Sequence, residues 1–203
     1  MHDQIVRRFQ DNIRRARNLL SVYQRLDPGG QGRRSVQDTD VLRAATVFTH
    51  AALEEVFRGL VGWKYPSAAE ILLNEIPLIG ISETGRPEKF FLGKLGAHRN
   101  KTVQQLIDES VSSYVGNMTV NNTTEISSFV RKLGVEPDMV NHQFAAISEL
   151  IERRHHIVHQ ADRNDVGGHG NHRAQALHSQ TVENWISAVE NFVTSLLEQM
   201  HDD

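Results

Sequence analysis

The chain has 203 residues, a formal net charge of −3 at pH 7 and 39% hydrophobic residues, and it contains no cysteine. This length suits a single domain, residues 1–203, built around one core. The lack of cysteine excludes disulfides, thiolate metal sites and a cysteine nucleophile. The N-terminal stretch MHDQIVRRF does not resemble a secretory signal, and no apolar run approaches the ~20 residues of a membrane span. We therefore expect a cytoplasmic protein.

Apolar residues recur every three or four positions through the first 60 residues, which predicts two long helices. The first covers residues 1–26, and the second runs from about residue 35 to Gly62. His50 lies off the apolar stripe of the second helix, so we expect it to be exposed. The two predicted core stripes are Ile5, Phe9, Ile13, Ala16, Leu20 and Tyr23, followed by Val41, Ala45, Phe48, Ala52, Val56 and Leu60.

Residues 63–134 are more broken and predict several short helices. Ser67 and Glu70 have the spacing of a capping box, in which two side chains satisfy free backbone N–H groups at a helix start. Thr102 and Asn122 are candidate N-caps of two further helices. We expect this region to be inserted between the second and third long helices.

A third long helix is predicted over residues 137–163, with Pro137 in its first turn. A loop rich in Gly, Asn and His follows, and a fourth helix is expected over residues 181–200. Its inward-facing residues are expected to be Trp185, Ile186, Val189, Phe192, Val193 and Leu196. The predicted fold is therefore all-α, a bundle of four long helices with short helices inserted between the second and the third.

Residues 153–163 carry three arginines and three histidines. Histidine can take up and return a proton near neutral pH, and arginine can stabilise negative charge on a phosphate. Arginine also accounts for 17 of the 22 basic residues of the chain, a bias that suits bidentate contacts with phosphate or carboxylate. The stretch therefore predicts a functional site on the third long helix.

A helical wheel with about 100° per residue separates the members of this stretch. Arg154 and His159 fall on opposite borders of the core-facing stripe, and His155 lies between them, one turn before His159. Side chains at such borders can reach a groove between helices or a second subunit. The stripe itself is predicted to consist of Phe144, Ile147, Ile151 and Val158.

Three kinds of chemistry fit these residues. In metal-independent RNA cleavage, histidine would move protons and arginine would stabilise the phosphoryl transition state. In a metal site, His155 and His159 would be a ligand pair four residues apart, with His169 and His172 as further ligands. The third alternative is structural.

In the structural alternative, Arg154 would pair with Glu149, Glu152 or a neighbouring helix, and the histidines would bond to backbone carbonyls. The spacing from arginine to histidine does not choose among these alternatives. Arg173 and His178 have the same spacing without the helical context.

The extended sequence around the histidines adds more than its spacing does. The run Arg-Arg-His-His-Ile-Val-His-Gln-Ala-Asp resembles the signature of the HEPN superfamily, and in particular that of its RiboL-PSP-HEPN branch. The likeness extends over roughly residues 36–198. Its further landmarks are Arg43–Arg58, Glu88–Leu95, Val120–Ile126 and Trp185.

This resemblance implies a homodimer with a metal-independent endoribonuclease site at the subunit interface and no cofactor. Arg154 and His159 would be the catalytic pair, and His155 would occupy the polar position after the arginine. The implied products are 2′,3′-cyclic phosphate and 5′-hydroxyl ends, from tRNA or mRNA. The implied setting is a toxin–antitoxin module or phage defence, with an antitoxin or regulatory partner chain.

Secondary candidates and one alternative complete the expectations. Arg153 and Arg163 are candidate binders of RNA phosphates. Glu54 or Glu55 could orient a motif histidine from the neighbouring helix. The alternative function is a HEPN-like module without catalysis that binds RNA, a nucleotide or a partner protein.

Overall fold

The computed structural model describes residues 2–26, 36–78, 92–163 and 174–200. The possible metal ligands His169 and His172, and Arg173 of the second spacing match, lie outside these residues. None of the described helices is both long and apolar enough to cross a membrane.

The described residues form helices joined by short connections and contain no β-strand. The prediction of an all-α fold with four long helices, and short ones between the second and third, is confirmed. The α-helices are α1 (His2–Leu26), α2 (Val36–Lys64), α3 (Glu70–Leu73), α4 (Val103–Asn117), α5 (Thr123–Lys132), α6 (Phe144–Gln160) and α7 (Ser179–Gln199). Short 3-10 helices cover Tyr65–Ser67, Leu92–His98, Pro137–Met139 and Asn141–Gln143.

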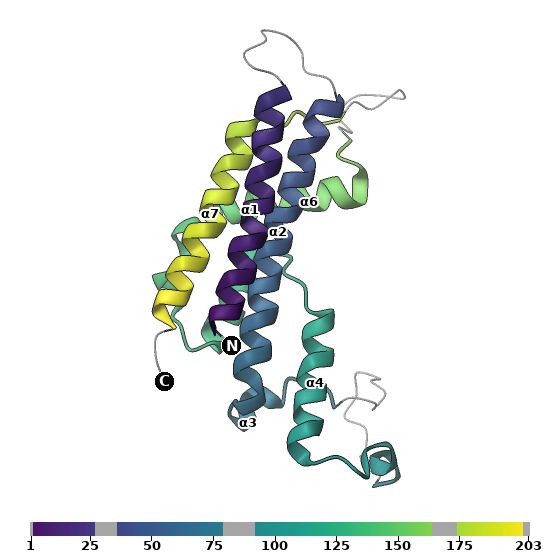
Figure 1. Cartoon of the computed structure of the whole chain (residues 1–203). Coiled ribbons are helices and arrows are strands. Elements are labelled where there is room, and N and C mark those ends of the chain that lie inside the picture. The colour runs from purple at the N-terminus through teal and green to yellow at the C-terminus, as the bar shows by residue number, and fades with distance from the viewer. Residues whose placement is uncertain (1, 27–35, 79–91, 164–173, 201–203) are drawn as a thin grey trace.

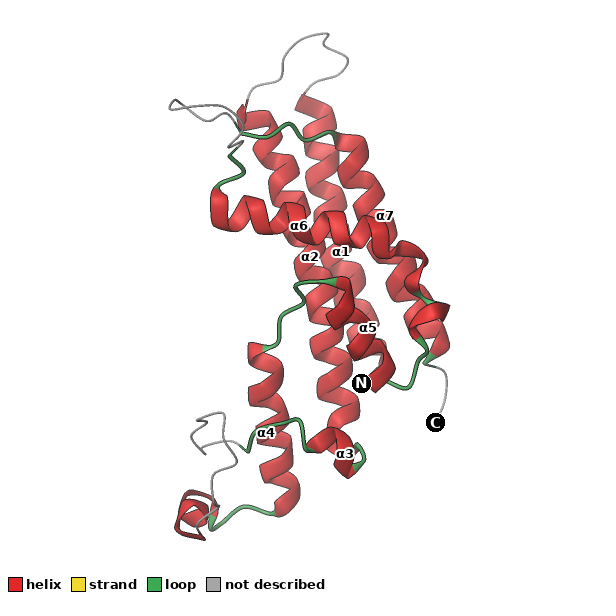
Figure 2. Cartoon of the chain, turned by 180° about the vertical axis from the view of Figure 1, so that it is seen from behind, coloured by secondary structure: helices red, strands yellow, loops and turns green. Residues whose placement is uncertain are grey.

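Three of the long helices, α1, α2 and α7, run alongside one another, and each contacts the other two (Figure 1). Helix α6 crosses α2 and α7 at a steep angle, and its C-terminal end projects past α2 (Figure 2). Helix α4 packs along the C-terminal half of α2. The crossing places the histidine-rich end of α6 beside the N-terminal half of α2.

The amphipathic stripes of α1 and α7 form the core as predicted. All six predicted stripe residues of α1 and all six of α7 are buried. Helix α2 contacts α1, α4, α6 and α7 and therefore buries more than one face. Arg43, His50 and Glu54 are buried on it as well, and His50 is only 1% exposed. The expectation that His50 is exposed is wrong, because a central helix has hardly any free face.

Two of the three predicted helix starts in the inserted region are confirmed. Thr102 and Gln105 form a complete capping box at the start of α4, and Asn122 accepts a hydrogen bond at the start of α5. Ser67 caps no helix, because it belongs to the 3-10 turn that follows α2. Ala69 precedes α3 instead, without a side-chain cap.

Helix α6 is shorter at both ends than the predicted range 137–163. Pro137 starts a separate 3-10 turn, and the α-helix begins at Phe144. At the other end, Ala161 adopts a left-handed conformation with φ of 50°, which terminates the helix. Val158 is 48% exposed, so its predicted place in the core stripe is wrong. Val158 lies near the C-terminal end of α6, which projects past α2 (Figure 2).

Candidate functional site

The three residues expected to be catalytic lie on the C-terminal half of α6. The ring of His159, which is exposed, packs against the ring of His155 with centroids 4.6 Å apart. Arg154 is half-buried and lines the same pocket as His155. His155 therefore contacts His159 on one side and shares a pocket wall with Arg154 on the other.

Arg154 has no hydrogen-bond or ion-pair partner among the described residues. The two carboxylates that could neutralise it from the same helix do not. Glu149 instead accepts a hydrogen bond from the indole Nε1 of Trp185 at 3.3 Å. A half-buried guanidinium without a carboxylate partner can accept an anion, and this does not favour the structural alternative for Arg154.

The pocket that contains Arg154 and His155 has a volume of about 310 Å³ and lies between α2, α6 and the segment before α5. Its buried lining residues are His50, Val120 and Ile151, from three parts of the chain, whereas most of its other lining residues are exposed. We call it the motif pocket. Its lining residues are His50, Val120, Asn121, Asn122, Ser148, Ile151, Glu152, Arg154 and His155.

One wall of the motif pocket is held in place by side chains of α2. His50 Nε2 lies 2.9 Å from the carbonyl oxygen of Val120, and Glu54 Oε1 accepts a hydrogen bond from the Val120 N–H at 3.2 Å. Arg58 donates two hydrogen bonds to the carbonyl oxygen of Met118, from Nε at 3.0 Å and from Nη2 at 2.8 Å. His50 and Glu54 thus satisfy both backbone groups of the buried Val120, and Arg58, four residues further along α2, satisfies the carbonyl of Met118.

The surroundings of His50 at this wall favour its neutral form. Burial is the main cause that lowers its pKa below the ordinary value, and the positive charge of Arg154 lowers it further. The carboxylate of Glu54, 4.0 Å from His50 Nδ1, raises the pKa of His50 but does not offset the lowering by burial. The structure thus places a histidine from α2, with a lowered pKa, within electrostatic reach of Arg154.

The end of α6 is anchored by a buried carboxylate that the site prediction did not include. Asp162 is 1% exposed, and its Oδ2 accepts hydrogen bonds from Arg43 Nε at 2.6 Å and from Arg153 Nη2 at 2.9 Å. The backbone carbonyl of Asp162 accepts a hydrogen bond from the N–H of Gln175 at 2.8 Å. We call Arg43, Arg153 and Asp162 the clasp; it ties the end of α6 to α2 and to the segment before α7.

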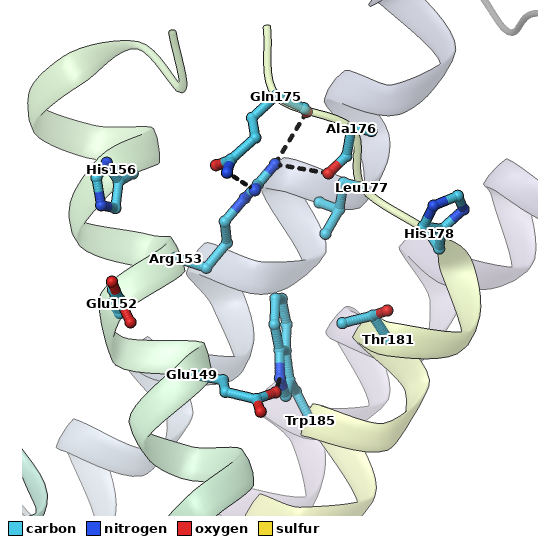
Figure 3. A pocket seen from close by; sticks show the side chains of 10 residues that line it. All are labelled: Glu149, Glu152, Arg153, His156, Gln175, Ala176, Leu177, His178, Thr181 and Trp185. Carbon is cyan, nitrogen blue, oxygen red and sulfur yellow. Dashed lines mark hydrogen bonds between the residues drawn. The ribbon is translucent and has the colours of Figure 1, made fainter. Parts of the chain in front are cut away.

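Arg153 belongs to the clasp rather than to an open surface. Its Nη2 also donates to the carbonyl oxygens of Gln175 at 2.9 Å and Ala176 at 3.2 Å, as Figure 3 shows. Burial lowers the pKa of Arg153, and its side chain is 11% exposed. These contacts do not favour the expectation that it binds RNA phosphates. Arg163, the other candidate, is exposed.

Figure 3 shows a second pocket, which is bordered by α7 and shares Glu152 with the motif pocket. Its volume is about 300 Å³, and Trp185 and Thr181 line it from α7. His156 faces this pocket, and its Nδ1 lies 2.7 Å from Gln160 Oε1. The three consecutive residues Arg154, His155 and His156 are therefore divided between two sides of the helix.

The proposed orienting role of Glu54 or Glu55 is not found. Glu54 bonds to the backbone of Val120, and Glu55 accepts a hydrogen bond from Asn12 of α1. Both carboxylates thus face elements other than α6. Among the described residues, no group of three or more His, Asp or Glu side chains is arranged to hold a metal ion.

Two contributions to the site could not be identified from the motif. His50 and Asp162 act through partners 70 and 119 residues away along the chain, respectively. The available signal was a series of polar side chains at four-residue spacing on a helix otherwise rich in apolar residues, at His50, Glu54 and Arg58. A wheel that scores only apolar residues does not detect it.

The comparisons with known proteins bear on the whole chain rather than on single residues. The RiboL-PSP-HEPN family model matches residues 10–202. No match was found among curated proteins or among solved structures. Since the match covers nearly the full length, the chain belongs to the RiboL-PSP-HEPN family of all-α domains.

Proposed function

We propose that this protein is a metal-independent endoribonuclease of HEPN type. The observation that carries the proposal is the grouping of three side chains: Arg154, which has no carboxylate partner among the described residues, shares a pocket with His155, and the His155 ring packs on that of His159. Such a set provides both things that RNA cleavage requires, proton transfer near neutral pH and stabilisation of phosphoryl charge.

The reaction needs two proton transfers. One histidine removes the proton from the ribose 2′-hydroxyl, and the 2′-oxygen attacks the adjacent phosphorus. The bond from phosphorus to the 5′-oxygen breaks, and a second histidine donates a proton to that leaving oxygen. The products are a 2′,3′-cyclic phosphate and a 5′-hydroxyl. Arg154 stabilises the additional negative charge on the phosphoryl oxygens during this exchange.

A homodimer would supply both proton carriers from one kind of residue. In a two-fold dimer, the same surface of each subunit meets at the axis, so two copies of His159 and Arg154 can face one phosphate. The exposed Val158 supports this arrangement, because it places an apolar side chain next to His159 at the projecting end of α6. His155, packed on the ring of His159, would hold that ring in position.

The biological setting proposed for this activity is a toxin–antitoxin module or phage defence, with tRNA or mRNA as substrate and a separate chain as antitoxin or regulator. Residues Gln160 and Ala161 follow the motif histidine, where the tyrosine-modified toxins of this superfamily carry a tyrosine. A partner of this protein would therefore act in another way, for example by covering the site.

The test is incubation of the purified protein with RNA in the presence of EDTA, followed by analysis of the new RNA ends. We expect cleavage by the wild type and a loss of at least about 100-fold in His159→Ala and Arg154→Ala, the usual range for removal of a general acid–base group. His156→Ala is the matched control, because His156 lies on the same helix but faces the other pocket. Cleavage abolished by EDTA, or retained in both site variants, would contradict the mechanism.

The alternative is a HEPN-like module that binds RNA, a nucleotide or a partner protein without cleaving it. It predicts retention of RNA without product, and equal retention by wild type and His159→Gln. The guanidinium of Arg154, which is unpaired among the residues that the structure describes, serves such binding as well as it serves catalysis. Only the end analysis separates the two functions.

A further inference from the structure

We propose that the motif pocket holds one nucleobase of a single-stranded RNA, with a preference for guanine, next to the phosphate that Arg154 binds. This inference rests on the proposed function for its RNA substrate, but it concerns recognition rather than the chemical step. Proteins read single-stranded RNA by stacking unpaired bases on aromatic or guanidinium planes and by bonding to their edges. The motif pocket provides both kinds of group.

The size and composition of the pocket favour a base over a bare phosphate. Its volume of about 310 Å³ is at the lower end of small-molecule sites. Arg154 is the one permanent positive charge among its lining residues, and Glu152 is negative. A phosphate inside it would meet a carboxylate. A base inside, with its phosphate at Arg154, meets neutral groups and an acceptor.

Several lining groups have hydrogen-bonding capacity to spare. Among the described residues, Ser148 and Glu152 have no hydrogen-bond partner, and neither does the side-chain oxygen of Asn121. The Nδ2 of Asn121 donates to Thr119 Oγ1 at 2.9 Å, so the amide oxygen is the unpaired atom of this side chain. Carboxylate and amide oxygens accept hydrogen bonds and do not donate them. Glu152 and the Asn121 oxygen are therefore acceptors available to a base, the Ser148 hydroxyl can donate or accept, and the donors of Arg154 are left for the phosphate.

Hydrogen-bond acceptors in a pocket favour a base that presents hydrogen-bond donors to them. The Watson–Crick edge of guanine presents two neighbouring donors, N1–H and the N2 amino group, and a carboxylate can accept from both at once. Adenine and cytosine each present one amino group there, and uracil presents a single N–H. Glu152 together with Asn121 is consequently expected to favour guanine.

The wall opposite α6 is rigid enough to support such recognition. Met118 and Val120 are held to α2 by His50, Glu54 and Arg58, and Asn122 caps α5 through the backbone N–H of Glu125 at 2.8 Å. Rigid groups lose little conformational freedom when a ligand binds, so their hydrogen bonds contribute more of their strength to affinity. The arrangement thus fits selection of one base rather than general contact.

The experiment measures binding of the 3′- and 5′-monophosphates of guanosine, adenosine, cytidine and uridine to the intact protein by calorimetry. We expect guanosine monophosphate to bind best. Ser148→Trp, which fills the pocket from an exposed position on α6, should weaken its binding by about tenfold or more. Thr181→Trp is the matched control, because it adds the same bulk to the other pocket and should leave binding unchanged.

Glu152→Gln tests the preference itself. The exposed position tolerates this change, and an amide keeps the size of the side chain but loses one acceptor oxygen. We expect the advantage of guanosine over uridine monophosphate to disappear while weak binding of both remains. An unchanged preference would overturn the guanine assignment. The pocket itself would be overturned if no nucleotide binds. It would also be overturned if Ser148→Trp, shown by circular dichroism to be folded, binds the nucleotides as the wild type does.

The outcomes also separate this inference from the nuclease proposal. If Ser148→Trp weakens nucleotide binding but the wild type cleaves no RNA, the proposed base pocket stands and the nuclease proposal is rejected. Cleavage of RNA without nucleotide binding keeps the nuclease and rejects the pocket. If both hold, Glu152→Gln should change the nucleotides found at the cleaved ends more than the rate of cleavage.

Discussion

The carboxylate of Asp162 lies 2.6 Å from Nε of Arg43, a residue 119 positions earlier in the chain. Asp162 directly follows the left-handed residue that ends α6, and its own φ is 54°. Arg43 is on α2, the helix that also provides His50 to the motif pocket. This ion pair therefore fixes the histidine-rich end of α6 against the helix that completes the pocket.

Removal of the clasp carboxylate should strongly destabilise the protein. In Asp162→Asn, two arginines whose side chains are 10% and 11% exposed lose their shared anion. Breaking a buried ion pair by removing one partner costs about 3–5 kcal/mol, because the remaining charge stays buried. Chemical denaturation should show this loss of unfolding free energy.

The matched control for the clasp is Asp11→Asn. Asp11 pairs with Arg14 at 3.0 Å on the exposed face of α1, and exposed pairs contribute about 0–1 kcal/mol. Equal effects of the two substitutions would show that the clasp is no stronger than a surface pair.

His50 should make the protein sensitive to acid. Its pKa in the folded state is lowered, so protons bind more tightly to the unfolded chain, and stability is lost as the pH falls below the ordinary histidine value of about 6.5. Glu54, Arg58 and Arg154 are the charged groups that act on it. His50→Gln keeps a donor for the carbonyl of Val120 but removes the titration.

Thermal melts between about pH 7 and pH 5 test this expectation. We expect the wild-type melting temperature to fall more steeply with acid than that of His50→Gln. Parallel curves for the two proteins would mean that protonation of His50 is not linked to unfolding.

Tyr65 offers a substitution that should stabilise the fold. Its hydroxyl is buried without a hydrogen-bond partner among the described residues, and burial raises the pKa of this phenol to about 12. An unsatisfied buried hydroxyl costs about 1–3 kcal/mol, so Tyr65→Phe should raise the free energy of unfolding by about 1 kcal/mol. A decrease measured by denaturation would instead reveal a partner for the hydroxyl.

Val158 tests the proposed dimer. It is 48% exposed and directly precedes His159 on the projecting end of α6. Val158→Asp should place two like charges near a two-fold axis, shift the protein to monomer in light scattering, and reduce RNA cleavage with the catalytic residues intact. Ile71→Asp is the control, since Ile71 is 77% exposed but lies on α3, away from the motif. A dimer that persists in Val158→Asp would place the interface elsewhere.

Local periodicity was sufficient for much of the fold. The stripes of α1 and α7 were predicted residue by residue, because each of these helices buries a single face and its apolar spacing records that face. The caps at Thr102 and Asn122 were predicted for a similar reason, since a cap involves residues only three positions apart.

Predictions were wrong where burial depends on partners that are distant in sequence. His50 is buried because α2 has neighbours on several sides, and Val158 is exposed because α6 extends beyond its neighbours. Neither fact has a counterpart in the spacing of residues along its own helix.

The sequence by itself determined the helical class, the faces of the outer helices, and the concentration of arginine and histidine on one helix, since these depend on side chains a few positions apart. Only the tertiary structure decided which contacts each of the neighbouring motif residues makes. Arg153 enters a clasp with Arg43 and Asp162, whereas Arg154 has no partner among the described residues and lines a pocket with His155 and a buried His50. One residue along a helix turns a side chain by about 100°, and the partners found there come from other helices.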